Sequence, residues 1–174
     1  ALPSTRIYDR NGILLYEIVD LYGGSHHTIP LNEMASCLPD ATIATEDANF
    51  YHHPGVDAQG VIRAAWINLR GGEVRAGGST ITQQVARNLL VTKHPAEDRS
   101  LRRKLQESVL ALQLTRRYSR DEILALYLNQ TYYGNLAYGV ESASQIYFGK
   151  SPSSLSLAEC AMLAGLPQAP SQYN

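Results

Sequence analysis

The sequence predicts a mainly α-helical fold with one short β-hairpin. Most stretches place apolar residues at helical spacing and begin or end at capping residues. Only residues 5–19 show β-prone runs on both sides of a turn dipeptide, Asn11-Gly12. The length of 174 residues suits about one domain, and 44% hydrophobic with 18% charged residues is an ordinary composition for a folded protein. We therefore expect a single domain over residues 1–174.

The charge and hydropathy of the chain narrow the classes of protein to which it can belong. Its formal net charge is −1, whereas nucleic-acid-binding domains usually carry a large basic excess. The sequence contains no run of about 18 apolar residues and no leading signal segment. We expect a soluble piece with no nucleic-acid partner. From the abrupt start and the uncapped end we also expect it to be part of a longer protein.

The remaining elements follow from breakers, caps and apolar spacing. After a loop over residues 22–28, helices alternate with short polar or glycine-rich connections. In chain order we predict helices from Pro30 to about Asp47 with an interruption at Pro39, over 57–70, from 79 or 80 to about 90, over 99–117, over 119–129, over about 140–148, and from 154 or 156 to about 166. Segments 71–78 and 131–139 are predicted loops, and the second is expected to line a groove.

Cysteine and histidine give no clear disulfide or metal pattern. Cys37 and Cys160 lie far apart in apolar or helical surroundings, which favours two buried free thiols over a disulfide or a metal site. The redox compartment stays open on this evidence. His26 and His27 are adjacent but have no third ligand at a suitable spacing, so the plain interpretation is a loop without metal.

The stretch 44–55 gathers groups that can do acid–base chemistry. Glu46 and Asp47 follow an apolar run, and we expect them at a helix end where the chain turns into a cleft. A partly desolvated carboxylate is a better general base than a solvated one. The alternative is an ordinary solvated acid pair with His53 as a surface residue.

Two further predicted helices carry cations, and each set of cations has two possible roles. Over 57–70, Arg63 and Arg70 punctuate an apolar surface, which suits either a membrane-surface helix or a core helix with two exposed arginines. Over 99–117, the run 102–104 is Arg-Arg-Lys and Glu107 follows one turn later. These residues suit either a surface ion pair or a site for a polyanion such as a diphosphate.

Polar groups crowd the start of the helix that follows the glycine-rich segment. Ser79 and Thr80 can both cap this helix, although one hydroxyl would be enough, and free amide groups there form an anion site. Gln83 and Gln84 add neutral donors, and Arg87 lies one turn further on. The density of polar groups favours ligand binding over a plain capped helix.

Five ordered motifs resemble a known family. Four of them are E-D-x-x-F-x-x-H-x-G at 46–55, G-x-S-T-I-T-Q-Q at 77–84, R-K-x-x-E at 103–107 and I-L-x-x-Y-L-N at 123–129. The fifth is a C-terminal group made of Y-F-G-K, L-S-L-A-E and L-A-G-L-P-Q-A-P. Together they resemble the peptidoglycan glycosyltransferases of family 51, which occur in bifunctional penicillin-binding proteins and monofunctional transglycosylases. The family often has lysine where this chain has Arg87, so the cation is retained.

The resemblance implies a lysozyme-like head lobe with a small membrane-proximal jaw, at roughly 55–78. It implies polymerisation of lipid II into glycan strands at the extracytoplasmic face of the bacterial cell membrane, with a transmembrane anchor and a C-terminal transpeptidase domain elsewhere in the full-length protein and moenomycin as an inhibitor. Carried over by position, Glu46 and Glu107 are the catalytic residues. The substrate-binding residues implied are Asp47, Phe50, His53, Ser79, Thr80, Gln83, Gln84, Arg87, Arg103, Lys104 and Asn129.

Chemistry predicts how these groups would act. A diphosphate leaving group needs no acid, so one base and positive charge or a Mg2+ or Mn2+ ion suffice for an inverting displacement. We expect Glu46 to be the base, with Glu107 orienting the cations or holding the metal. The alternatives are a peptidoglycan-cleaving, lysozyme-like enzyme, whose neutral substrate gives no reason for the basic run at 102–104, and a non-catalytic lipid-carrier or wall-binding module, which leaves both carboxylates unexplained.

Overall fold

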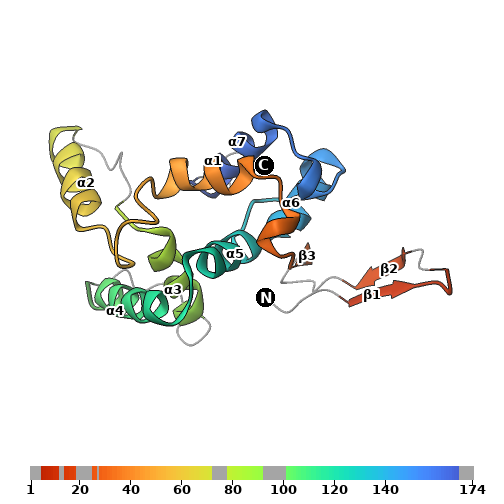
Figure 1. Ribbon diagram of the computed structural model, residues 1–174, viewed down its shortest axis with the longest axis horizontal. Coiled ribbons are helices and arrows are strands. Elements are labelled where there is room, and N and C mark those ends of the chain that lie inside the picture. Colours follow the sequence, from red (N-terminus) through yellow and green to blue (C-terminus); the bar gives the residue numbers. More distant parts are fainter. Residues whose placement is uncertain are drawn as a thin grey trace. The chain divides into compact units, whose positions relative to one another are not determined.

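A computed structural model describes residues 5–11, 14–18, 25–26, 28–71, 78–91 and 101–168. The predictions for Gly12, His27, most of the loop over 22–28, residues 72–77 and the first two residues of the 99–117 helix lie outside these residues. The chain forms two compact units, Ala1–Thr42 with Leu128–Asn174, and Ile43–Tyr127. Helices make up most of the described residues, which confirms the mainly α prediction (Figure 1).

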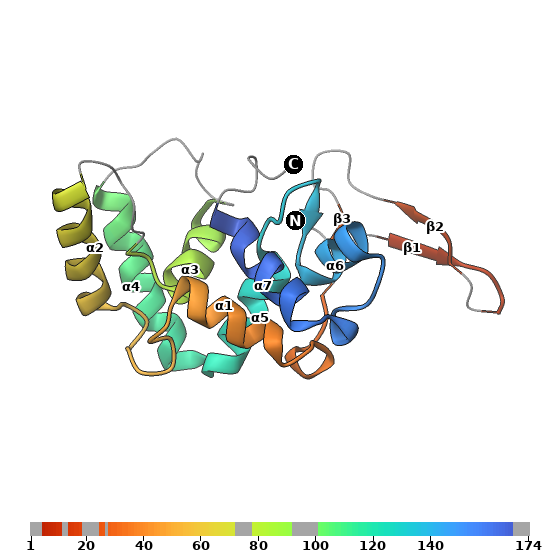
Figure 2. The same cartoon turned by 90° about the horizontal axis from the view of Figure 1, so that it is seen from above.

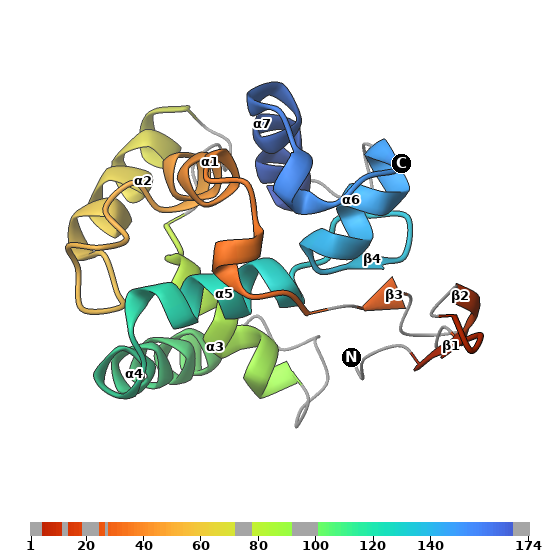
Figure 3. The same cartoon turned by 45° about the vertical axis from the view of Figure 1, so that its right-hand side comes forward.

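Among the described residues, strand is confined to two short pairs. β1 (Thr5–Tyr8) and β2 (Leu14–Ile18) pair in antiparallel fashion (Figure 3). β3 (Ser25–His26) and β4 (Ala137–Tyr138) pair in parallel. Both pairs belong to the first unit.

Short helices build the rest of the first unit, where α6 packs against β4 and α7. Apolar side chains at helical spacing form its core, together with Tyr133 from the loop after α5. The elements are the 3₁₀ turn η1 (Leu31–Glu33), the start of α1 (Cys37–Glu46), α6 (Val140–Phe148), η2 (Pro152–Ser154), α7 (Leu157–Gly165) and η3 (Leu166–Gln168). The core residues include Leu38, Leu128, Tyr133, Val140, Ala143 and Leu163.

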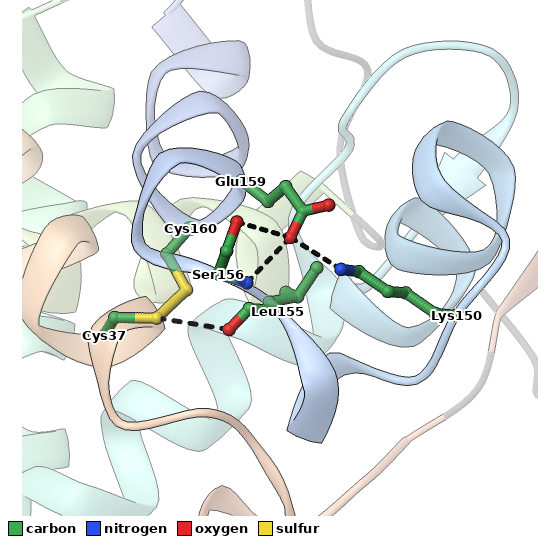
Figure 4. The surroundings of a disulfide bond; sticks show 6 residues. All are labelled: Cys37, Lys150, Leu155, Ser156, Glu159 and Cys160. Carbon is green, nitrogen blue, oxygen red and sulfur yellow. Dashed lines mark hydrogen bonds and ion pairs between the residues drawn. A yellow bond between two sulfur atoms is a disulfide. The ribbon is translucent and has the colours of Figure 1, made fainter.

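A disulfide joins Cys37, at the start of α1, to Cys160 in α7 (Figure 4). The expectation of two free thiols is therefore wrong. The two residues are 123 positions apart in sequence, but the fold brings their Cα atoms to 5.9 Å, within the range that a disulfide spans. Sequence separation gives no sign of this pairing, because it depends on how α1 and α7 pack.

The second unit carries α2 (Ala58–Gly71), α3 (Ile81–Val91), α4 (Leu101–Arg117) and most of α5 (Arg120–Gln130). α3 and α4 lie side by side (Figures 1 and 2). The buried residues that hold this unit together include Phe50, Ile81, Val85, Ala111, Leu114, Ile123 and Leu124. No helix among the described residues is both long enough and apolar enough to cross a bilayer.

Gly55 allows the segment before α2 to lie directly on α4. Its φ is +106°, and a Cβ atom there would lie 2.8 Å from the carbonyl oxygen of Ala111. Only glycine adopts this backbone conformation without strain and leaves room for so close an approach. Thr115 adds a second contact, because its hydroxyl donates to the carbonyl of Pro54 at 2.7 Å.

One predicted helix boundary is wrong. The interruption expected at Pro39 does not occur, and Pro39 lies inside the first turn of α1. A proline is tolerated there because the first N–H groups of a helix have no partner within the helix. The chain instead leaves helical geometry between η1 and α1, where Met34 has an extended backbone.

Candidate active site

Glu46 is the last residue of α1 and is half-buried. Its Oε2 accepts a hydrogen bond of 2.7 Å from Nε2 of Gln84, in the first turn of α3. Its Oε1 is buried and has no hydrogen-bond partner among the described residues. An unsatisfied buried acceptor costs on the order of 1–3 kcal/mol, so this oxygen is a strong candidate to receive a hydrogen bond or proton from a ligand.

A cleft opens beside Glu46 within the second unit. Asp57, Arg63 and Ser79 are among the residues that line it. Its volume of about 150 Å³ is below the roughly 300 Å³ of the smaller drug-sized ligand pockets, so it suits one sugar-sized group. The backbone N–H of Gly60 is the main cause that lowers the pKa of Asp57, so this carboxylate serves as the cap of α2.

Asp47 and His53 form a buried pair in the segment after Glu46. Nε2 of His53 lies 2.9 Å from Oδ1 of Asp47, and the N–H of Gly55 donates to Nδ1 at 3.0 Å. Nδ1 is therefore the unprotonated nitrogen, and Nε2–H donates to the carboxylate. Oδ2 of Asp47 also accepts from the N–H of Ile81, the first residue of α3, at 3.0 Å. Contacts within the protein thus account for both side chains.

Thr80 and Gln83 form a reciprocal capping arrangement at the start of α3. The N–H of Thr80 donates to Oε1 of Gln83 at 3.0 Å, and the N–H of Gln83 donates to Oγ1 of Thr80 at 3.1 Å. Oγ1 of Thr80 also donates to the carbonyl of Gly55, and Nε2 of Gln83 donates to Oγ of Ser108 on α4. The two buried side chains join three segments of the site.

Three cations surround one buried carboxylate. Glu107 is only 1% exposed. Its Oε1 lies 3.0 Å from Nε of Arg87 and 3.3 Å from Nε of Arg103, and its Oε2 lies 3.5 Å from Nζ of Lys104. We call Arg87, Arg103 and Lys104 the cation cluster. Three positive charges against one negative leave an excess of two, which favours an anionic ligand.

The pKa of Lys104 reflects this environment. Burial lowers it most, the negative charge of Glu107 opposes that effect, and Arg87 and Arg103 lower it further. Arg87 and Lys104 also donate to Oγ of Ser79, the first of them at 3.5 Å. Ser79 lines the cleft beside Glu46 as well. Ser79 therefore links the cleft beside Glu46 to the cation cluster.

Two other predicted site residues have contacts of their own. Phe50 is fully buried in the core of the second unit. Asn129 belongs to the first unit, where its side chain accepts from the N–H of Ile29 at 2.9 Å and donates to the carbonyl of Ile29 at 2.8 Å. Asn129 thus belongs to the first unit, whereas the residues that line the cleft belong to the second.

The donor set at Glu107 does not fit a divalent cation. Its oxygens already face three cations, which would repel Mg2+ or Mn2+. These metals take several oxygen ligands, and no group of three His, Cys, Asp or Glu side chains gathers in the part of the chain that the structure describes. Glu107 and its neighbours therefore do not form a divalent-cation site by themselves.

Sequence reasoning missed three residues near the site. Arg63 was interpreted only as a surface cation, yet it lines the cleft. Ser108 accepts from Gln83 and donates to the carbonyl of Lys104. Arg120, at the start of α5, donates to the carbonyl of His53. No local pattern marks Ser108 or Arg120. Arg63, however, is a cation three residues before the exposed Trp66 on the same helix, and this spacing could have drawn attention to it.

Comparison with known proteins gives the family. A family model described as transglycosylase matches residues 11–174. Penicillin-binding protein 1A of Aquifex aeolicus is 43% identical over 171 residues, which cover 98% of this chain and 23% of that protein. Penicillin-binding protein 1A of Pseudomonas aeruginosa is 45% identical over 170 residues, which cover 97% of this chain and 20% of that protein.

A crystal structure of penicillin-binding protein 1A from Haemophilus influenzae aligns with a TM-score of 0.46 and 25% identity, over 99% of this chain and 15% of that chain. The chain thus spans less than a quarter of the length of these curated relatives. Because the family model matches residues 11–174, nearly the whole chain, the chain belongs to the transglycosylase family.

Proposed function

We propose that this chain is a peptidoglycan glycosyltransferase that polymerises lipid II into glycan strands. The observation that carries the proposal is Oε1 of Glu46, which has no hydrogen-bond partner among the described residues and lies beside the cleft. Ser79 lines this cleft and also accepts a hydrogen bond from Lys104 of the cation cluster. A base next to a site for a departing anion is what transfer from a glycosyl diphosphate requires. Membership of the transglycosylase family supports the same activity.

In the proposed step, the growing lipid-linked chain is the donor and the GlcNAc 4-hydroxyl of a second lipid II is the acceptor. Oε1 of Glu46 takes the hydroxyl proton while the hydroxyl oxygen attacks the anomeric carbon from the face opposite the diphosphate. The bond from that carbon to the diphosphate oxygen breaks, and undecaprenyl diphosphate leaves with the electron pair. Gln84 holds Oε2, which leaves Oε1 for the acceptor.

The cation cluster would stabilise the charge that develops on the leaving diphosphate. Arg87 and Arg103 supply planar guanidinium groups, which bind phosphate oxygens through paired hydrogen bonds. Glu107 keeps the three like charges together and leaves an excess of two. Because the leaving group is already a stable anion, no second carboxylic acid has to protonate it.

The lipid tail of this substrate would confine the reaction to a bilayer surface, and α2 is the candidate contact. Ile62 and Trp66 are 70% and 56% exposed, and the guanidinium of Arg70 lies 4.3 Å from the centroid of the Trp66 ring. Exposed apolar side chains with flanking cations suit the boundary between headgroups and acyl chains. Loss of vesicle binding in an Ile62→Ser, Trp66→Ser variant would support this contact, and unchanged binding would contradict it.

The wider setting follows from the same proposal. We place a jaw at roughly residues 55–78 and the protein at the extracytoplasmic face of the bacterial membrane, with a transmembrane anchor and a transpeptidase domain elsewhere in a longer chain. A disulfide between Cys37 and Cys160 supports that location, because disulfides persist in oxidising compartments. The relatives are several times longer and bear the name penicillin-binding protein. Moenomycin would bind at the same cleft.

The test is lipid II polymerisation followed on a gel, with an added divalent cation and, in parallel, with a chelator. We expect Glu46→Gln to lose activity by a factor of at least about 100, because it keeps the shape and removes the basicity. Glu33→Gln, an exposed change in η1, is the matched control and should polymerise normally. Near-normal products from Glu46→Gln would refute the assignment of the base, and cleavage of preformed peptidoglycan by the unaltered protein would favour a lysozyme-like activity instead.

A further inference from the structure

We propose that Arg120 is a positioning residue that holds residues 47–55, the turn that follows Glu46, in the geometry needed for catalysis. We call this segment the 47–55 turn. The inference rests on the proposed function, because it takes Glu46 to be the base. Arg120 itself touches neither the cleft nor the cation cluster, so its action would pass through the turn.

Helix stability does not explain an arginine at this position. Arg120 is the first residue of α5, and the positive end of the helix dipole disfavours a cation there. The helix start is already complete, because Glu122 accepts from both the N–H and the Oγ of Ser119, and Oγ accepts from the N–H of Glu122. A cation at the positive end of a helix dipole is unfavourable, so we expect contacts outside α5 to supply the stabilisation that offsets it.

The compensating contacts are all with the 47–55 turn. The guanidinium of Arg120 donates to the carbonyl of His53. It also lies over the ring of Phe50, 5.6 Å from the ring centroid, which is a favourable arrangement for a cation on an aromatic face. Burial lowers the pKa of Arg120, and the carboxylate of Asp47 opposes that change, so the group is partly desolvated and feels the charge of this turn.

The contacted residues lead directly to Glu46. His53 donates to Asp47, the N–H of Phe50 donates to the carbonyl of Asp47 at 2.8 Å, and Asp47 follows Glu46 in the chain. The guanidinium thus braces the two residues that fix the backbone beside the base. A shift of about 1 Å in a reacting group can cost on the order of 100-fold in rate.

The planar shape of arginine is needed for both contacts at once. One guanidinium nitrogen reaches the carbonyl of His53 while the flat face covers Phe50. NH1 of Arg120 is buried and has no hydrogen-bond partner among the described residues. A lysine could keep the positive charge and donate to one carbonyl, but it has no flat face to cover Phe50, so it could make only one of the two contacts.

The test compares Arg120→Lys and Arg120→Ala with the same substitutions at Arg116, an exposed residue in the last turn of α4. We expect Arg120→Ala to lower kcat for lipid II polymerisation roughly 10- to 100-fold with KM changed less than about twofold, because only the transition state loses its alignment. Arg120→Lys should retain an intermediate rate. Guanidinium ion at millimolar concentration should restore part of the activity of Arg120→Ala, and it should leave both Arg116 variants unchanged.

The outcomes separate this inference from the proposed function. If the unaltered protein polymerises lipid II, Glu46→Gln does not, and the Arg120 variants keep their kcat, the positioning role is overturned while the function stands. It is also overturned if kcat falls only in proportion to the folded fraction, measured by circular dichroism, and guanidinium restores nothing. If the unaltered protein makes no glycan strand, the proposed function fails first.

Discussion

Two neighbouring carboxylates in the site have different surroundings. Glu46 has one oxygen beside the cleft that finds no hydrogen-bond partner in the part of the chain that the structure describes. Asp47 is buried, and its oxygens accept from His53 and from the backbone of Ile81. A carboxylate whose oxygens both accept from donors within the protein is held in place, whereas an oxygen without such a donor can contact a ligand. In the mechanism proposed above, Asp47 therefore positions the segment and Glu46 meets the substrate.

The Asp47–His53 pair predicts a measurable stability difference between adjacent histidines. His53→Ala would remove the side-chain donor to a buried carboxylate and should lower the free energy of unfolding by about 1–3 kcal/mol or more. His52→Ala changes an exposed neighbour and should stay within about 0.5 kcal/mol. Urea unfolding followed by circular dichroism measures both variants, and equal midpoints would show that the buried pair contributes nothing.

At the scale of one element, a carboxylate in the first turn of α7, Glu159, makes the stability of the protein depend on pH. Oε2 of Glu159 accepts from the N–H and Oγ of Ser156, both at 2.7 Å, and from Nζ of Lys150 at 2.8 Å. These hydrogen bonds, with Lys150 first, lower the pKa of Glu159 from 4.5 to about 2. The group is at the surface, so water and salt screen part of the effect.

This lowered pKa sets the direction of a pH dependence. Because the folded-state pKa lies below the unfolded value of 4.5, the contribution of Glu159 is complete above pH 4.5 and is lost as the pH falls towards 2. We expect Glu159→Gln to flatten this part of the stability curve relative to Glu33→Gln, which alters an exposed acid in η1. Thermal melts at pH 2 to 6 make the comparison, and parallel curves for the two variants would contradict the assignment.

Helices with strong local signals could be predicted closely from the sequence. The ranges of α5 and α6 agree with expectation because each has an apolar stripe with a clear end signal, namely the Ser119 cap before α5 and Gly149 after α6. The boundary predicted at Pro39 was wrong, since a proline in a first turn and a proline in a helix interior look alike in sequence when the start of the helix is unknown. The pairing of Cys37 with Cys160 has no local signal at all.

The same limit applies to the site. The chemistry-bearing stretches around Glu46, Ser79 and Glu107 could be located in the sequence, because each concentrates unusual residue types. The different surroundings of Glu46 and Asp47 could not be predicted, since they depend on Gln84 and Ile81, which lie more than 30 positions away in sequence. Arg120 was invisible for the same reason, because its partner His53 is 67 positions distant.

At the scale of the whole molecule, one covalent bond constrains a large part of the chain. Cys37 and Cys160 are 123 positions apart in sequence, so the bond closes a long loop. We expect reduction, or Cys37→Ser, to lower the free energy of unfolding by about 2–5 kcal/mol and the melting temperature by roughly 2–4 °C for each kcal/mol. Differential scanning fluorimetry with and without reductant measures this change. A reductant should not affect a Cys37→Ser, Cys160→Ser variant, and an equal response from that variant would show that the bond is not responsible.

The bond between Cys37 and Cys160 also closes residues 37–160 into a macrocycle. A protease that cuts this ring once opens it without releasing a fragment, so the nicked protein keeps its full mass on a denaturing gel until thiol is added. The ring includes Glu46, Ser79 and Glu107. A single scission inside it therefore leaves every proposed catalytic group on one covalently connected molecule.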